Sequence, residues 1–344
     1  DMMHNHKATH TFGPDFGYLL LVNKTTQEER EVEKWDLSHL KVAMSAAEKV
    51  RYATLKSFTD AFAGCGFRAE TFCPAYGLAE HAVGVTINSL KSLPQVLNVQ
   101  RTELENDGEV VANSTQDDAE TTRLKQLVGS GRAWNETDVR IILLDDEGTP
   151  LSIAPQDRVG EIWVSSLSKT LGYHKLPDTT EEVFHARLPG SDPSSDDGKK
   201  EYLRTGDLGF ISSENGELFV CGRNKDMIII AGKNHYSEDM ELNISEALTG
   251  YLRPGCIAAF AVESQETGEE ELHIVAEVTN HCVDLTACFQ KIHECIAREH
   301  HINVSTVTLI NSKSIPKTSS GKIRRFLVRE LLLAGKLNVV SGGT

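Results

Sequence analysis

The chain has 344 residues, of which 40% are hydrophobic and 25% charged, values typical of a globular protein long enough for two or more domains. Its formal net charge is −15, with 50 acidic against 35 basic residues, which argues against a nucleic-acid or anionic-membrane partner because both favour an excess of Lys and Arg. No apolar run reaches the length of a membrane span, and the sequence begins with neither an initiator methionine nor a signal peptide, so we expect the chain to start within a longer protein.

The seven cysteines are odd in number and lack the spacing of a zinc site. Cys288 and Cys295 lie one heptad apart on a predicted helix, which is typical of buried core thiols. This cysteine usage favours a reducing, cytoplasmic compartment.

Strand-like and helix-like segments alternate over residues 1–127, which predicts an α/β layer. The short apolar runs at 19–22, 40–42 and 69–73 are predicted strands. Apolar residues recur at helical spacing over 46–62, and glycines at 64 and 66 end this predicted helix. Residues 89–127 are polar with few apolar anchors, which indicates an insertion or a long surface excursion.

Residues 128–221 read as a small β-rich subdomain with little helix, and residues 189–199 as an exposed loop. A compact α+β domain is predicted for 222–344. Its last residues, 337–344, would suit a linker. The predicted strands of these two parts are 139–144, 159–164, 218–220, 227–230, 257–262, 272–278 and 304–310, and the predicted helices are 238–248, 285–298 and 323–333.

The segment YGLAE, residues 76–80, follows the predicted strand at 69–73. A glycine after an aromatic residue permits a tight strand-to-helix turn, which would expose Tyr76 and Glu80 at the carboxyl end of the strand. An exposed aromatic ring can stack on a base, and a carboxylate can hold Mg²⁺ on phosphates. Taken alone, the segment also fits a turn with a core tyrosine and a helix-capping glutamate.

In the segment YLRTGDLG, residues 202–209, an aspartate lies between two glycines. Asp207 is therefore suited to accept two hydrogen bonds from a ribose diol, although an ordinary Asx turn would have the same pattern. The segment GRNKD, residues 222–226, places charged residues before an apolar strand at the predicted domain boundary, as a hinge or a solvated connection would.

The segment IPKTSSGKIRR, residues 315–325, carries Lys322 on a Ser/Gly-rich loop directly before a predicted helix. A mobile lysine can neutralise the charge that develops between a carboxylate and an α-phosphate, whereas the alternative is a basic loop that is merely solvated. Each structural alternative is reasonable for one segment alone, but the presence of all four segments in this order is harder to explain in that way.

In that order, YGLAE, YLRTGD, GRNKD and PKTSSGKI resemble the adenylate-forming superfamily of acyl-CoA synthetases, peptide-synthetase adenylation domains and luciferases. The resemblance is closest to the fatty acyl-AMP ligases in FRAETFCPAYGLAE, VGSGRAW, LRTGDLGF, IIIAGKNHYSEDME and LRPGCIAAFAVE. Those ligases carry an inserted segment where this chain has residues 89–127. The resemblance implies an α/β plus α+β fold, with a partial N-terminal adenylation domain over 1–221 and a mobile C-terminal domain over 222–344.

The resemblance also implies roles for the nucleotide-binding residues. Tyr76 would stack on adenine, with Gly77 forming the turn behind it. Asp207 would bind the ribose hydroxyls, assisted by Arg223. Glu80 would help to hold Mg²⁺ and act in catalysis.

Two lysines have implied roles as well: Lys225 as the hinge between the domains and Lys322 as the catalytic lysine of adenylation. Ala47 and Glu48 match a loop that lies beside adenine in relatives. Their neighbours Ser45, Ala46 and Lys49 depart from the Asn-Gly-Ala-Glu-Pro-like pattern of that loop.

Relatives carry, further upstream, a Ser/Thr/Gly-rich loop with a lysine that grips the ATP phosphates, and this sequence has no such segment. Residues 9–16, THTFGPDF, already resemble the acyl-pocket region that follows that loop. We therefore expect the chain by itself to be inactive and its first hundred or so residues to fold poorly, because a partial sheet leaves edges and apolar faces uncovered.

For the whole protein, the resemblance implies a two-step ligase that uses Mg·ATP to convert a fatty acid to acyl-AMP. The acyl group would then pass to the phosphopantetheine thiol of an acyl carrier protein or polyketide synthase. Two alternatives stay open: a fatty acyl-CoA synthetase, and a non-catalytic protein that binds acyl-adenylate or acts as a scaffold.

Overall fold

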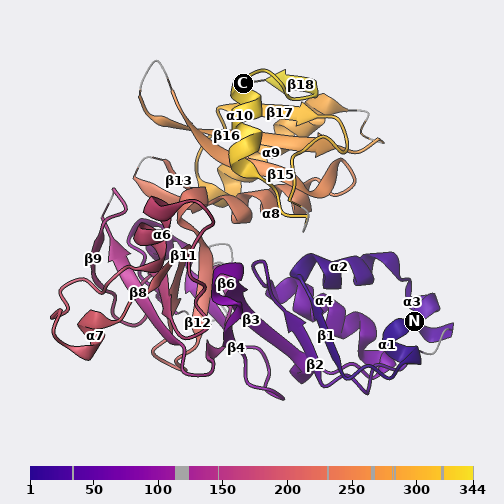
Figure 1. The fold of residues 1–344 in the computed structure, drawn as a ribbon. Helices are drawn as coiled ribbons and strands as arrows, with labels where there is room; N and C mark the ends of the chain where they lie inside the picture. The colour runs from indigo at the N-terminus through magenta and orange to yellow at the C-terminus, as the bar shows by residue number, and fades with distance from the viewer. Residues whose placement is uncertain are drawn as a thin grey trace. The chain divides into compact units, whose positions relative to one another are not determined.

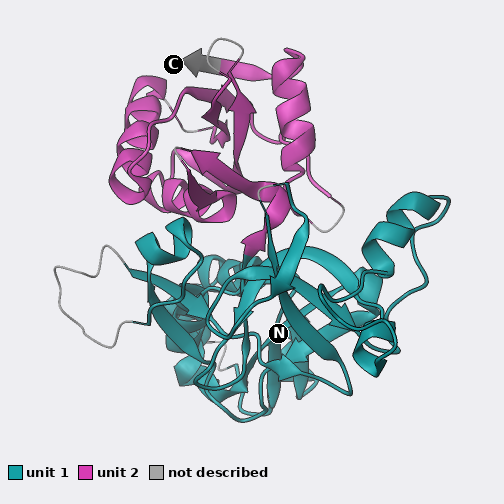
Figure 2. Ribbon diagram, turned by 90° about the vertical axis from the view of Figure 1, so that its left-hand side faces the viewer, with its two compact units in different colours: residues 1–221 teal, residues 222–344 magenta. Residues whose placement is uncertain are grey.

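The computed structural model describes residues 1–32, 35–112, 124–145, 147–230, 232–264, 268–280, 282, 284–318 and 321–343. The chain divides into two compact units, Asp1–Cys221 and Gly222–Thr344, coloured teal and magenta in Figure 2. The first unit combines a helix-covered, partly parallel sheet with a β-rich part, and the second mixes helices with a four-stranded sheet. This is the expected α/β plus α+β class.

The first sheet of the first unit has the strand order β1-β2-β3-β4-β7. β1, β2 and β3 are parallel, whereas β4 and β7 are antiparallel to their neighbours. Parallel pairing aligns the carboxyl ends of β2 and β3, where ligands bind in open α/β sheets. The strands are β1 (His10–Gly13), β2 (Val42–Ser45), β3 (Phe72–Leu78), β4 (Val83–Ile87) and β7 (Arg132–Ala133).

Helices α2 (Asp15–Lys24) and α4 (Tyr52–Phe62) pack against one another beside this sheet (Figure 1). α4 buries Leu55, Phe58 and Phe62, which recur at helical spacing on one face. The two phenylalanine rings join an aromatic core whose neighbouring centroids lie between 4.5 and 5.6 Å apart. Short helices α1 (Met2–Asn5) and α3 (Gln27–Val32) complete this part.

Several predicted boundaries in this region are wrong. The run at 19–22 is not a strand but part of α2, and the helix predicted over 46–62 begins only at Tyr52. The strands predicted at 40–42 and 69–73 are displaced toward the C-terminus, to β2 and β3. A 3-10 turn, Ala69–Thr71, occupies the start of the second of these.

The second sheet of this unit has the order β12-β11-β10-β8-β9, and its printed pairings are antiparallel. β10 is buried along its whole length, as a central strand requires. The predicted strands at 139–144, 159–164 and 218–220 fall within β8, β10 and β12 apart from the first residue of the second. The strands are β8 (Asp138–Leu144), β9 (Pro150–Ile153), β10 (Gly160–Ser165), β11 (Leu203–Ile211) and β12 (Leu218–Arg223).

Two predicted irregular segments contain regular structure. Within 89–127, β5 (Val96–Gln100) pairs with β6 (Leu124–Val128), and helix α5 (Arg101–Asn106) follows β5. Residues 113–123 of that predicted insertion lie outside the described residues. The predicted loop at 189–199 ends in the short helix α7 (Asp196–Lys199), after helix α6 (Pro177–Phe184).

The second unit contains a four-stranded sheet in the order β15-β16-β17-β18. β16 and β17 are parallel, and the two outer pairings are antiparallel. Its core includes Ile244 from α8, Ile274 from β16 and Ile292 from α9. The elements are β13 (Met227–Ile230), β14 (Lys233–Tyr236), α8 (Ser237–Ala247), β15 (Leu252–Glu263), β16 (Glu270–Val278), α9 (Leu285–His300), β17 (Thr306–Ile310), α10 (Arg325–Leu333) and β18 (Val339–Gly343).

Within the tail at 337–344, which suits a linker by composition, residues 339–343 instead form β18, which pairs antiparallel with β17 in the sheet. All seven cysteines are free, and all but Cys282 are buried, as predicted for core thiols. Among the described ranges, none of the helices is both long and apolar enough to cross a membrane.

Candidate functional site

Tyr76 and Asp207 come together although 131 positions separate them. The Tyr76 hydroxyl donates a hydrogen bond to Asp207 Oδ2 at 2.7 Å, which links β3 of the first sheet to β11 of the second. The Tyr76 side chain packs with Val85 and Ile162 in an apolar cluster between the sheets and is only 9% exposed. The tyrosine therefore lies within a strand rather than exposed at its end, because β3 continues through Leu78 to pair with β4.

Gly77 occupies a place where a side chain has no room. A Cβ at this position would lie 1.6 Å from the carbonyl oxygen of Val83 on β4. The register of β3 and β4 also shifts between Tyr76 and Gly77. Glycine here permits the close backbone approach that holds the Tyr76 ring against the second sheet.

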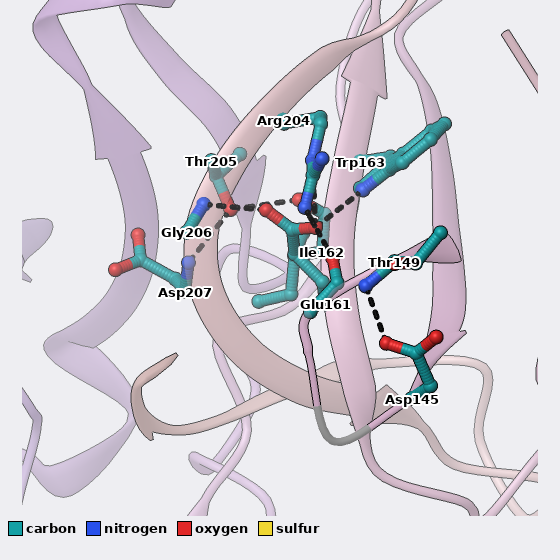
Figure 3. Close-up of polar contacts among 10 residues, drawn as sticks. Asp145, Thr149, Glu161, Ile162, Trp163, Arg204, Thr205, Gly206 and Asp207 are labelled. Carbon is teal, nitrogen blue, oxygen red and sulfur yellow. Dashed lines mark hydrogen bonds and ion pairs between the residues drawn. The ribbon is translucent and has the colours of Figure 1, made fainter. Parts of the chain in front are cut away.

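The backbone before Asp207 is fixed by Glu161, a buried carboxylate on β10 (Figure 3). Glu161 Oε1 accepts a hydrogen bond from the Gly206 amide at 3.1 Å, and its Oε2 pairs with Arg204 Nη2 at 3.0 Å. The indole Nε1 of Trp163 donates to the same Oε2 at 2.9 Å. Three donors thus neutralise and orient a carboxylate that burial would otherwise disfavour.

A second set of bonds orients Asp207 itself. The Thr205 hydroxyl donates to the carbonyl of Ile162 at 2.7 Å and accepts the Asp207 amide at 3.1 Å. Gly206 between them has φ +71°, a conformation that favours glycine. The Asp207 carboxylate consequently projects from a backbone held on two sides, as Figure 3 shows.

Glu80 lies in the 3-10 turn Ala79–His81 that follows β3. Its Oε1 accepts a hydrogen bond from the Tyr173 hydroxyl at 2.9 Å, and its backbone carbonyl accepts the Thr170 amide at 2.9 Å. A carboxylate has about four lone-pair sites, so the bond to Tyr173 leaves capacity for Mg²⁺ on a nucleotide.

The neighbouring His81 is buried and bridges two segments. Its Nδ1 lies 2.9 Å from the Gly84 carbonyl oxygen and its Nε2 lies 2.6 Å from Ser166 Oγ. Because a carbonyl only accepts, Nδ1 must donate, and the neutral ring then accepts the Ser166 hydroxyl at Nε2. Burial lowers the pKa of His81 below its ordinary value, although its hydrogen bonds oppose the shift.

The loop that contains Ala47 and Glu48 follows the carboxyl end of β2. Ala47 is exposed with φ +72°, and Glu48 Oε1 accepts the amide of Phe16 at 2.5 Å. Buried Asp15 accepts the amide of Arg51 at 3.0 Å and thereby fixes the start of α4 after the loop. These contacts place the loop beside the carboxyl ends of the parallel strands.

In the second unit, Lys322 lies on a segment whose described arms, 316–318 and 321–324, are hydrogen-bonded to one another and form a hairpin. The Thr318 amide donates to the Lys322 carbonyl at 2.8 Å, and the Lys322 amide donates to Thr318 Oγ1 at 3.1 Å. The Arg324 amide bonds to the Pro316 carbonyl at 3.0 Å. Lys322 itself is exposed, while 319–320 at the tip lie outside the described residues.

The two remaining predicted residues also belong to the second unit. Arg223 ends β12, and Lys225 lies in the following 3-10 turn, Asn224–Asp226; both are exposed. The structure thus joins Tyr76 to Asp207 and holds Glu80 and the Ala47–Glu48 pair by separate contacts. Sequence reasoning missed Glu161, Tyr173 and His81; an acidic residue inside the apolar run GEIWV was the one available signal.

Known proteins match this chain over most of its length. Residues 1–174 match the family model described as AMP-binding enzyme. Among curated relatives, the medium-chain-fatty-acid–acyl-carrier-protein ligase JamA of Moorena producens is 36% identical over 97% of this chain and 53% of its own length. The 4-hydroxyphenylalkanoate adenylyltransferase of Mycobacterium marinum is 37% identical over 91% of this chain and 48% of its own length.

Solved structures give a consistent result. A chain from a study of fatty acyl-adenylate ligases of E. coli and L. pneumophila has a TM-score of 0.80 at 27% identity, covering 97% of this chain and 55% of that one. A fatty acyl-adenylate ligase of L. pneumophila in complex with acyl adenylate and pyrophosphate has a TM-score of 0.59 at 34% identity, covering 100% of this chain and 56% of that one. The chain spans about half the length of the curated relatives it matches.

The family model covers 174 of the 344 residues, and that span includes Tyr76, Gly77 and Glu80. The chain therefore belongs to the AMP-binding enzyme family.

Proposed function

We propose that the complete protein activates a fatty acid by forming its acyl-adenylate from Mg·ATP and then transfers the acyl group to a carrier-protein thiol. The observation that carries this proposal is the Tyr76–Asp207 pair, which joins two predicted nucleotide-binding residues in the unit that matches the AMP-binding family. The names of the relatives, a fatty-acid ligase and an adenylyltransferase among them, support the same chemistry.

In the first step, a carboxylate oxygen of the fatty acid bonds to the α-phosphorus of ATP. The bond from that phosphorus to the bridging oxygen breaks, and pyrophosphate leaves without any proton transfer. Asp207 holds the ribose hydroxyls, with Arg223 on the same sugar, and the Tyr76 side chain with Gly77 borders the adenine. Glu80 would hold the Mg²⁺ that accompanies the nucleotide, and the Lys322 ammonium would offset the negative charge where carboxylate and phosphate meet.

In the second step, the sulfur of a phosphopantetheine thiol attacks the acyl carbonyl. The bond from the carbonyl carbon to the AMP oxygen breaks, AMP leaves, and the thiol proton passes to solvent. The second unit turns about Lys225 between the steps. The name of JamA, an acyl-carrier-protein ligase, supports a carrier protein or polyketide synthase as the acceptor.

A second acceptor has specific support. A relative from Mycobacterium leprae, 34% identical over 92% of this chain, is named a putative fatty-acid–CoA ligase. A thiol-acceptor assay with coenzyme A against a phosphopantetheinylated carrier protein separates the two, and we expect faster transfer to the carrier.

Seven free cysteines and a net charge of −15 support a reducing, cytoplasmic setting without nucleic acid.

Substituting Lys322→Ala in the protein expressed from its complete gene tests the catalytic assignment. We expect fatty-acid-dependent ATP–pyrophosphate exchange to fall by about 100-fold or more, because the group that offsets transition-state charge is gone. ATP affinity, measured by equilibrium binding, should change little because this lysine acts in the transition state.

Lys336→Ala is the matched control, since Lys336 is an exposed lysine of the same unit, three residues after the end of α10. It should exchange at the wild-type rate. Exchange by Lys322→Ala at the rate of this control would remove Lys322 from the mechanism. A folded wild-type protein that binds acyl-adenylate yet never exchanges would favour the non-catalytic alternative.

A further inference from the structure

Arg325, the first residue of α10, lies three residues after Lys322 and pairs with three carboxylates, of which Glu238 is the most distant, 3.8 Å from Nη2. Its Nε and Nη2 donate to the two oxygens of Glu241 at 2.7 and 2.8 Å, a bidentate pair. Its Nη1 donates to Asp226 Oδ2 at 2.7 Å. The Arg325 side chain is 13% exposed, so both pairs are shielded from solvent.

Asp226 connects this guanidinium to the segment that carries Lys225. It is the last residue of the 3-10 turn Asn224–Asp226. Its backbone carbonyl accepts the hydroxyl of Ser237 at the start of α8, the helix that also carries Glu241. The turn is therefore tied to α8 through its backbone and to α10 through its side chain.

Glu241 makes the other half of the junction rigid. Its Oε1 accepts the Ala259 amide of β15 at 3.0 Å in addition to the Arg325 bond. Burial alone would lower the pKa of Arg325, but Glu241 and Asp226 raise it well above its ordinary value, so the guanidinium stays charged. A planar fork that binds two carboxylates at once cannot be replaced by the single ammonium of lysine.

The Lys322 hairpin is fixed at both of its ends. The end that runs into α10 is held by Arg325, and Ile323 packs against the cluster that includes Val328. At the other end, the Ile315 amide donates to buried Glu277 Oε1 at 2.7 Å. The Asp226–Arg325 bond thus ties the turn at Lys225 to the residue that directly follows Arg324, whose amide bonds the Pro316 carbonyl across the hairpin, all within the second unit.

We propose that Arg325 is a positioning residue that makes the Asn224–Asp226 turn and the Lys322 hairpin move as one body, so that rotation at Lys225 sets where the Lys322 ammonium points. The roles of Lys225 and Lys322 in this inference rest on the proposed function. The coupling of the turn to the hairpin does not depend on it. The Arg325 guanidinium is occupied by carboxylates of its own unit, so its effect on the reaction would pass through Lys322.

Asp226→Asn tests the proposal with the least damage, because it removes one charged contact and leaves the Glu241 fork in place. Adenylation depends on Lys322, so we expect kcat for ATP–pyrophosphate exchange to fall by about 10- to 100-fold, as small misplacements of a catalytic group do, with KM for ATP nearly constant. Transfer of the acyl group from synthetic acyl-adenylate to a thiol should change by less than about threefold, because Lys322 has no charge to offset in that step.

Glu330→Gln is the matched control, an exposed acid on α10 exchanged for its amide. It should leave both half-reactions at wild-type rates. Arg325→Lys keeps the charge but loses the fork, and should lower adenylation at least as much as Asp226→Asn. Equal loss of both half-reactions in Asp226→Asn would indicate a general structural defect and overturn the proposal.

Amide hydrogen exchange on the purified chain separates this inference from the proposed function. In Asp226→Asn, the amides of Lys322 and Arg324 should exchange about 10-fold faster or more, because the hairpin has lost its tie to the turn. Unchanged exchange there would overturn the coupling whether or not the wild-type protein is a ligase. Faster exchange together with an inactive wild type would leave the coupling standing and remove the proposed function.

Discussion

At the scale of single residues, the orientation of the candidate binding residues depends on buried side chains behind them. Glu161 holds the Gly206 amide and the Arg204 guanidinium, and so fixes the backbone from which Asp207 projects. Removing one partner from a buried charged pair is costly because the other is left without compensation. The orientation of Asp207 is therefore set by the interior of the second sheet.

Gly77 permits a direct test at this scale. Gly77→Ala would place a methyl group 1.6 Å from the Val83 carbonyl oxygen, so β3 or β4 must shift. We expect the free energy of unfolding to fall by about 1–3 kcal/mol, the usual effect of overpacking. Urea denaturation followed by circular dichroism would measure the loss.

Gly64→Ala provides the comparison, since a Cβ there would meet no atom within 4 Å and its φ is not in the left-handed region. That variant should be as stable as the wild type or slightly more so. Equal stability of the two variants would show that the close approach of β4 to Gly77 does not exist in solution.

At the scale of elements, turns and loops rather than strands connect the parts of the site. The turn Ala79–His81 is joined to the loop after β10 by three hydrogen bonds, two to Glu80 from the Tyr173 hydroxyl and the Thr170 amide and one to His81 from the Ser166 hydroxyl. The His81 bond uses a neutral ring, whose Nε2 accepts the Ser166 hydroxyl.

We expect the first unit to lose stability in mild acid because of His81. Burial lowers its folded-state pKa, whereas the unfolded value is about 6.5. Below that pH the unfolded chain binds a proton that the folded chain resists, so the free energy of unfolding falls by up to about 1.4 kcal/mol per pH unit until the folded pKa is reached. Urea denaturation at a series of pH values between about 5 and 8 measures this slope.

His81→Gln removes the titrating group and keeps an amide that can accept the Ser166 hydroxyl. Its stability should vary less with pH than that of the wild type over this window. His6→Gln, at an exposed histidine, should retain the wild-type slope. The account of His81 is wrong if the His81→Gln and wild-type slopes coincide.

Elements with a clear period were predictable from the sequence. The strand at 227–230 matches β13, and the helix predicted at 285–298 corresponds to α9, which ends two residues later. The buried face of α9 repeats at helical spacing, and the Asp284 side chain accepts the Ala287 amide at its N-terminus. Local pattern and tertiary packing agree in these elements.

Elements whose conformation depends on distant partners were not predictable. The run at 19–22 is too short for its period to distinguish strand from helix, and it forms part of α2, whose Tyr18 bonds the Met44 carbonyl at 2.8 Å. β18 forms by antiparallel pairing with the edge of β17, a partner that the local sequence does not reveal. The sequence motifs identified Tyr76 and Asp207 separately, but their contact depends on how two sheets pack together.

At the scale of the whole molecule, the chain carries its family match in the first unit and the Lys322 hairpin in the second. The Arg325 network and the Lys322 hairpin that it adjoins both lie in the second unit. Because the chain spans about half the length of its relatives, chemistry has to be measured on the protein from the complete gene.

The most direct test of acyl-adenylate formation follows an oxygen atom. A medium-chain fatty acid labelled with ¹⁸O in both carboxylate oxygens is incubated with ATP, the protein and a phosphopantetheinylated carrier, and the AMP is analysed by mass spectrometry. If the carboxylate attacks the α-phosphorus, one ¹⁸O must leave with AMP when the thiol takes the acyl group. AMP without label, or label in inorganic phosphate, would contradict the account.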